Sequence, residues 1–156
     1  ETFESPVVNF KNLHVLTDYF QQAHMRTAGG QVRHIILSEE GFTSDSISRG
    51  KVYDIQAAAF AYAYYLVDNN PYIDAFILNR QVDAITEVET SCAFGLWTVD
   101  MSRPDKVIAV MPKNIYQVFK HIDTRKSLRY SEFAKSIVGI SDWSEVIPGF
   151  DPEKYQ

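Results

Sequence analysis

The sequence has almost no cysteine, no long hydrophobic run and no cluster of basic residues. Cys92 is the only cysteine among 156 residues, so an internal disulfide is impossible, and no cysteine–histidine grouping has the spacing of zinc ligands. No apolar run approaches the roughly 18–20 residues that span a membrane. The net charge of −5, without a basic cluster, argues against a surface for nucleic acid or anionic lipid. We therefore expect no metal, no cofactor, no nucleic acid and no membrane among the partners of this chain.

Apolar and aromatic residues, in contrast, are plentiful. They make up 46% and 13% of the chain, which predicts a globular domain with a substantial core. At 156 residues the chain is nevertheless too short for an eight-stranded α/β barrel, which takes about 250. Its first residue is Glu rather than Met, and we expect the natural N-terminus to lie upstream.

Two short apolar segments have the composition of buried parallel strands. The first runs from about Val32 to Ser38 and stops on Glu39-Glu40-Gly41. The second, Ile73 to Leu78, ends on Asn79-Arg80-Gln81. Both segments therefore pass from apolar to polar residues at their carboxyl ends, where α/β sheets carry their reactive groups.

Helical periodicity surrounds these strands. It is clearest from Asp54 to Val67, and a first helix is expected from Asn12, a typical N-cap residue. The order helix, strand, helix, strand predicts parallel strands joined by right-handed crossovers. The apolar face predicted for the longer helix comprises Ile55, Ala59, Tyr62 and Leu66.

The second half of the chain is less regular. Residues 94–99 predict a short strand or extended segment, whereas the apolar residues of 106–111 fit either a strand or a helix. Pro112 opens a clearer helix, and a short one is expected over 131–137.

The C-terminal tail, residues 143–156, contains two prolines. We expect it to lie on the surface, anchored by Trp143 and Phe150. Residues 126–156, the last helix and the tail, are expected to pack on the domain that residues 1–125 form.

One motif resembles a known family. Ser38-Glu39-Glu40-Gly41-Phe42 resembles the nucleophile motif, Thr/Ser-Glu-any-Gly-aromatic, that ends the seventh strand of the (β/α)8 barrels in clan A of retaining glycoside hydrolases. The elements that follow match in order: a polar loop, a helix beginning Gln56-Ala57-Ala58, a strand and polar loop, Gly95-Leu96, and a helix led by Pro112-Lys113. More narrowly, the chain resembles uncharacterised bacterial barrel proteins distantly related to that clan. The resemblance covers about residues 10–125 and implies an α/β fold of a particular kind: a partial TIM (β/α)8 barrel, with the last two βα units plus C-terminal helices.

The resemblance places the family's nucleophile on Glu39. In a retaining enzyme this carboxylate attacks the anomeric carbon, with an acid group about 5–5.5 Å away. Strand alternation groups Glu39 with Ile35 and Leu37 and puts Glu40 on the opposite face. A bulge before Gly41 would shift the role to Glu40.

The substrate-binding candidates implied by the resemblance follow the second strand. The clan commonly places a tryptophan at the end of its eighth strand, where this chain has Asn79 or Arg80. An arginine beside Glu39 would favour the ionised carboxylate and could hydrogen-bond a sugar or a carboxylated substrate. Trp97 is a further candidate, because a flat aromatic ring can stack on a sugar face.

Each candidate has a structural alternative. A carboxylate at a strand end is often a helix cap or a surface ion-pair partner. Arg80 can pair with Asp83 or Glu87 instead of a ligand, and Trp97 can pack in the core. The acidic residues between positions 83 and 89 lack the regular alternation and glycine of a calcium loop.

The implied function is that of a glycoside hydrolase-like domain with a retaining mechanism, acting on a carbohydrate or glycoside. This segment alone is expected to be inactive, because the clan's acid/base glutamate belongs to a strand that this chain lacks. Two strands cannot close a barrel, so we expect an upstream barrel segment or self-association to cover their edges. The alternative is a non-catalytic barrel that binds carbohydrate or serves as a scaffold.

Overall fold

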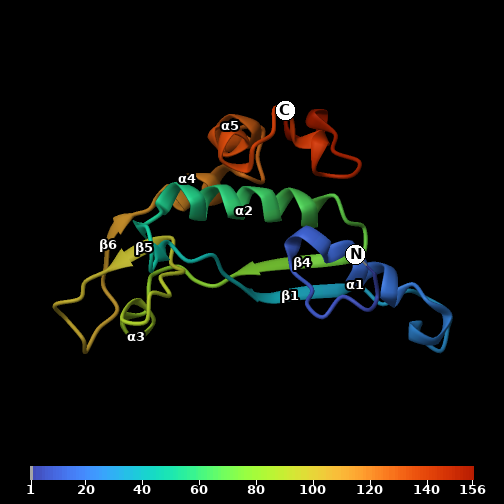
Figure 1. Ribbon diagram of the computed structural model, residues 1–156, viewed down its shortest axis with the longest axis horizontal. Helices are drawn as coiled ribbons and strands as arrows, with labels where there is room; N and C mark the ends of the chain where they lie inside the picture. The colour runs from blue at the N-terminus through green and yellow to red at the C-terminus, as the bar shows by residue number, and fades with distance from the viewer. Residues whose placement is uncertain (1) are drawn as a thin grey trace.

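A computed structural model describes residues 2–156 and has a mixed α/β architecture (Figure 1). Two strands, β1 (Ile35–Glu40) and β4 (Ile73–Leu78), pair in parallel. Helix α2 (Tyr53–Asp68) lies in the segment that connects them and packs along the pair. The predicted α/β class and the predicted parallel pairing are therefore confirmed, and β4 has the bounds expected from the sequence.

The other elements surround this unit. They are α1 (Leu13–Phe20), β2 (Asp45–Ser46), β3 (Gly50–Lys51), α3 (Ile85–Val88), β5 (Trp97–Val99), β6 (Ala109–Pro112), α4 (Asn114–His121) and α5 (Ser127–Val138), with short 3-10 helices at Phe10–Asn12, Ala23–Met25, Trp143–Glu145 and Pro152–Tyr155. Strands β2 and β3 form one antiparallel pair, and β5 and β6 form another. The ambiguous segment 106–111 thus contributes a strand, and the last helix begins at Ser127 rather than at 131. No helix among residues 2–156 combines the length and the apolar character needed to cross a bilayer.

Strand β1 begins three residues later than predicted, at Ile35, and includes both glutamates. Its first ladder contact is the hydrogen bond from the Ile35 amide to the Tyr72 carbonyl, 2.9 Å. Tyr72 follows Pro71, whose ring cannot donate to a ladder. Pairing therefore starts only where the partner strand starts, and Val32 lies outside it.

Helix α2 is the centre of the fold. It lies between the β1–β4 pair and helix α5, with α4 beside it (Figure 1). Neighbours on several sides bury it almost all round: Ala57, Ala61, Ala63 and Tyr65 have no exposed surface. The predicted face of Ile55, Ala59, Tyr62 and Leu66 is only half-buried, so the expectation of a single buried face was wrong. A helix covered on opposite sides shows this pattern.

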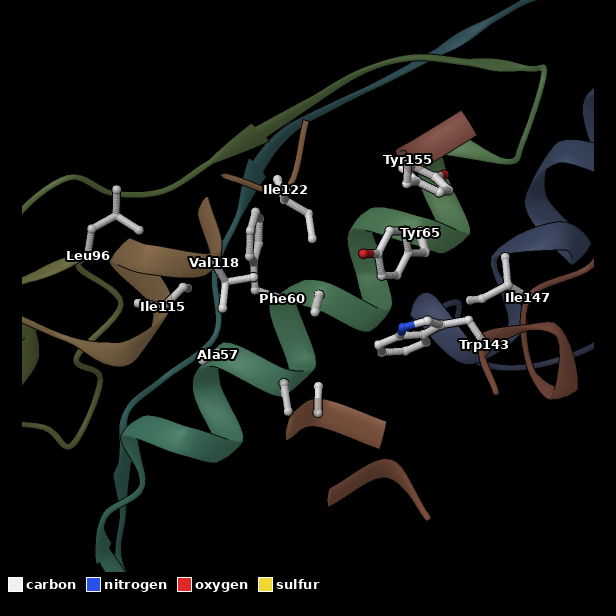
Figure 2. Close-up of a cluster of buried hydrophobic side chains, with 13 residues drawn as sticks. Ala57, Phe60, Tyr65, Leu96, Ile115, Val118, Ile122, Trp143, Ile147 and Tyr155 are labelled. Carbon is white, nitrogen blue, oxygen red and sulfur yellow. The ribbon is translucent and has the colours of Figure 1, made fainter. Parts of the chain in front are cut away.

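The core follows α2 from end to end, as Figure 2 shows. Toward one end, Phe60 lies near Val118 of α4. Toward the other, the ring of Tyr65 lies 4.9 Å from that of Trp143, measured between centroids. One continuous cluster of apolar side chains therefore joins the strands, the central helix and the C-terminal helices.

The tail lies on the surface and contributes three side chains to this core. Trp143, Ile147 and Tyr155 are buried, with exposed fractions of 0%, 1% and 4%. The Tyr155 hydroxyl donates to the carboxylate of Asp68 at the end of α2, 2.5 Å away. Most of the other residues of the tail are exposed, and the rings of Trp143 and Phe150 both contact that of Tyr65 on α2. The prediction of a surface tail anchored by these two residues is therefore confirmed, and Ile147 and Tyr155 are further anchors that it did not include.

The described part of the chain leaves the far face of the β1–β4 pair uncovered. Helices α2, α4 and α5 all lie on one side of the two strands (Figure 1), and Phe76 and Leu78 pack against the helical core on that side. On the other side Ile36 and Ile77 are 61% and 52% exposed. Within residues 2–156 the sheet has only these two strands, although parallel sheets are normally buried on both faces.

Candidate functional site

The polar residues that follow β1 and β4 meet at one edge of the sheet. The amide of Asn79 donates to the carbonyl of Glu40 over 2.7 Å, and the register pairs Glu40 with Leu78. Parallel strands bring their carboxyl ends to the same edge. The structure therefore brings Glu39, Glu40 and Asn79 into one neighbourhood, as the sequence predicts.

A bulge in β1 decides which way the two glutamates point. The register pairs Leu37 with Phe76 and Glu40 with Leu78, so β1 has one more residue than β4 over this stretch. Paired residues of parallel strands share a face, and Leu78 packs against the helical core. Glu40 is thus placed on the helix side and is half-buried, while Glu39 falls on the uncovered face and is exposed.

The faces on which Glu39 and Glu40 lie differ from those expected from strict alternation, because the bulge interrupts the alternation. Unbroken alternation would keep Glu39 on the same side as Leu37, which is the helix side. We expected that a bulge would transfer the nucleophile position to Glu40. Instead, the bulge places Glu39 on the uncovered face, together with Ile36, and leaves Glu40 on the helix side, together with Leu37.

The surroundings of Glu40 also make it a poor nucleophile. Burial raises the pKa of its carboxyl group above the ordinary value. An attacking carboxylate has to be ionised, so an environment that favours the protonated form works against that role.

The raised pKa gives a stability prediction for Glu40→Gln. Between pH 4.5 and the raised pKa the folded protein binds more protons than the unfolded chain, so this group destabilises the fold progressively as the pH rises. The variant should therefore be more stable relative to the wild type at pH 7 than at pH 4, as measured by urea unfolding at both values. The exposed Glu39→Gln is the matched control for loss of one negative charge; an identical pH dependence in both variants would contradict the prediction.

Arg80 forms an ion pair in the loop after β4. Its Nη2 donates to Oε1 of Glu87, on the short helix α3, over 2.7 Å, and the two side chains are 39% and 29% exposed. Of the two carboxylates that the sequence offered, Arg80 thus pairs with Glu87 and not with Asp83. Arg80 Nε and Glu87 Oε2 are buried and make no hydrogen bond to the described residues.

Arg80 and Trp97 line a common pocket with a volume of about 320 Å³. Its lining combines polar, aromatic and aliphatic residues: Arg80, Gln81, Trp97, Tyr116, Phe119, Leu78 and Leu96. The rings of Trp97 and Tyr116 meet edge to face with centroids 5.2 Å apart. Two of the predicted substrate-binding residues are therefore brought together, whereas Asn79 and Glu39 do not line this pocket.

A buried ion pair lies behind the site, between Lys113 and Asp83. Lys113 Nζ is 2.7 Å from Asp83 Oδ1, and the two side chains are 0% and 4% exposed. The same ammonium donates to Ser44 Oγ at 2.9 Å and to the carbonyl of Ala93 at 3.1 Å. Asp83 Oδ1 also accepts from the Gly95 amide, 2.6 Å. This cluster joins the loop after β1, the loop after β4 and the start of α4.

The cluster has the properties of a structural clamp and not of a serine–lysine catalytic pair. Three acceptors engage the three protons of the ammonium group, which leaves none of its hydrogen bonds unmade. The Ser44 hydroxyl donates to the Ala93 carbonyl at 3.1 Å and is completely buried. Burial lowers the pKa of Lys113, and the hydrogen bond and charge of Asp83 oppose this effect.

Gln56 reinforces the same loops from helix α2. Its side-chain amide donates to the carbonyl of Phe42 at 2.8 Å, with longer contacts to the carbonyls of Ala93 and Gly95 at 3.3 Å. The glutamine is 1% exposed. The sequence motif that begins α2 thus fixes the turn that directly follows Glu39 and Glu40.

Sequence reasoning missed the roles of Lys113, Asp83 and Ser44, although one signal was present. Lys113 is the residue immediately before α4, at the end of a helix where the dipole disfavours a cation. A lysine at that position predicts a carboxylate partner. The sequence could not show which carboxylate it is, because Lys113 and Asp83 are 30 residues apart.

No group of three or more His, Cys, Asp or Glu side chains within residues 2–156 is arranged to hold a metal ion.

Comparison with known proteins identifies the family of the chain but assigns it no function. No curated protein and no solved structure matches the chain. A family model matches residues 1–146, and the chain therefore belongs to the family of unknown function DUF5722.

Proposed function

We propose that this chain is the C-terminal portion of a (β/α)8 barrel related to the retaining glycoside hydrolases, with Glu39 as the nucleophile. The observation that carries the proposal is the position of Glu39. It stands at the carboxyl end of a parallel β–α–β unit, on the face that no helix within residues 2–156 covers. In (β/α)8 barrels that face lines the interior, and the carboxyl ends of the strands carry the active site.

The uncovered side chains support this reading. Ile36 and Ile77 are large, apolar and more than half exposed on the same face of the sheet. Branched apolar residues of this kind fill the interior of a closed barrel in layers. Six further strands would bury them and pair the free edges of β1 and β4.

The chemistry assigned to Glu39 is nucleophilic. Its carboxylate oxygen attacks the anomeric carbon, the bond to the leaving oxygen breaks, and a carboxylic acid from the upstream part of the barrel gives that oxygen its proton. Water then attacks the glycosyl ester, the same upstream residue takes the proton from the water, and Glu39 is released as a carboxylate. Residues 1–156 would supply only one of the two carboxyl groups, so we expect no hydrolysis by this segment alone.

The test compares the wild type with Glu39→Gln in the longest natural chain that contains this segment. Hydrolysis of a panel of activated aryl glycosides should fall by several orders of magnitude in the variant, because the amide cannot attack the anomeric carbon. Glu132→Gln, on the surface of α5, controls for the loss of a negative charge. A larger loss in Glu40→Gln than in Glu39→Gln would move the role to Glu40, and undiminished hydrolysis in both would refute the mechanism.

A second candidate is a non-catalytic barrel that binds carbohydrate. The observation that favours it is Arg80, which stands where the glycosidase clan commonly has an aromatic residue and is engaged by Glu87. Sugar binding by the natural chain, with no hydrolysis of any aryl glycoside, would support this candidate over the first.

A further inference from the structure

We infer that the pocket between Arg80 and Trp97 accepts an uncharged sugar unit and discriminates against an anionic one. This inference rests on the proposed carbohydrate ligand and specifies its class. It uses the pocket lining, the ion pair between Arg80 and Glu87, and the pairing of the two aromatic rings.

The charge of the pocket is balanced. Arg80 is the only charged residue in its lining, and Glu87 lies 2.7 Å from the guanidinium. Glu87 does not itself line the pocket, but its contact with the guanidinium cancels the net charge of Arg80. A carboxylated sugar therefore meets a neutral ion pair and not a free cation, and its electrostatic gain is correspondingly small.

The unused hydrogen-bonding capacity suits hydroxyl groups. A guanidinium carries five N–H donors; in Arg80 the contact with Glu87 uses one and the Nε donor is buried, which leaves three. Gln81 and Tyr116 also line the pocket; a glutamine side chain carries both donors and an acceptor, and a tyrosine hydroxyl can act as either. A sugar hydroxyl also donates and accepts, so it can satisfy groups of both kinds at once.

The rest of the lining suits the carbon face of a sugar ring. Trp97 and Tyr116 meet edge to face, an arrangement that occupies the face of only one of the two rings. Leu78, Leu96 and Phe119 complete an apolar wall. The volume of about 320 Å³ is at the lower end of the range for small-molecule pockets, which fits a short saccharide.

Calorimetric binding to the natural chain tests the inference. The probes are the neutral disaccharides cellobiose, maltose and lactose, with glucuronic acid as the anionic comparison. At least one neutral sugar should bind more tightly than glucuronic acid, and Trp97→Ala and Arg80→Met should each weaken that binding about 10-fold or more. Arg103→Met is the matched control, because Arg103 is an exposed arginine with its own carboxylate partner, Asp105, 3.4 Å away.

Glu87→Gln gives a readout that damage to the fold would not produce. It leaves Arg80 without a countercharge, so binding of glucuronic acid should strengthen about 10-fold relative to the neutral sugar. Tighter binding of glucuronic acid by the wild type, or no saccharide binding at millimolar concentrations, overturns the inference. So does binding that is unchanged in both pocket variants. These measurements concern binding and not hydrolysis, so their outcome does not depend on whether Glu39 is the nucleophile. If the natural chain proved to be a glycosidase that prefers uronides, the proposed function would stand and only this inference would be overturned.

Discussion

Replacing Lys113 with Met should lower the free energy of unfolding by about 3–5 kcal/mol, because removal of one partner leaves a buried charge without compensation. Asp83 is 3% exposed, so water cannot replace the lost ammonium. Ser44 Oγ and the Ala93 carbonyl lose a donor at the same time. Urea unfolding monitored by circular dichroism measures the change.

Two further variants separate charge burial from the loss of a lysine. Lys51→Met removes an exposed lysine that is 2.7 Å from Asp45, and it should cost no more than about 1 kcal/mol. The double variant Lys113→Met/Asp83→Asn should recover part of the stability, since the amide no longer carries an unpaired charge. A single-variant loss no larger than that of Lys51→Met would mean that the buried pair contributes little.

Gly95→Ala should destabilise the fold by about 3 kcal/mol or more, at the upper end of what overpacking costs. A β-carbon at this position would overlap the backbone nitrogen of Asp83 and lie 2.7 Å from the carbonyl oxygen of Trp97. Both are backbone atoms, and a hydrogen bond of 2.9 Å joins these two groups. Neither can move without breaking the connection between the loop after β4 and strand β5. The thermal unfolding midpoint and urea unfolding should both show the loss.

Gly29→Ala is the matched control for this substitution. At Gly29 the nearest atoms to an added β-carbon belong to side chains, at 3.8 and 3.9 Å, which is ordinary van der Waals contact. The control should therefore leave stability almost unchanged. Equal effects of the two substitutions would show that the backbone around Gly95 can relax.

The strands and the central helix could be predicted because local chemistry limits them. Pro71 and Asn79 bracket β4 on both sides, and the bounds of this strand were predicted correctly. The start of β1 was not, because it depends on where its partner begins 38 residues later in the chain. The single-faced reading of α2 failed for a similar reason, since alanine gives little sign of how many neighbours will cover it.

The candidate site was only partly predictable. Motif order proposed Glu39 and Arg80, and the flat ring of Trp97 made it a further candidate; Arg80 and Trp97 do share a pocket. The direction in which Glu39 points depends on a bulge that appears only when two strands are in register. The burial of Lys113 depends on contacts with residues up to 69 positions away, which no local pattern encodes.

The alanines of α2 also limit how sequences in this family can diverge. Ala57, Ala61 and Ala63 have no exposed surface, and they belong to a helix with the strands on one side and other helices around it. Methyl groups at these positions set the distances between layers, so a larger residue requires a smaller one in the layer that it faces. We therefore expect these positions to vary rarely and in a correlated way, while Asp54, the one exposed residue of the same helix, varies freely.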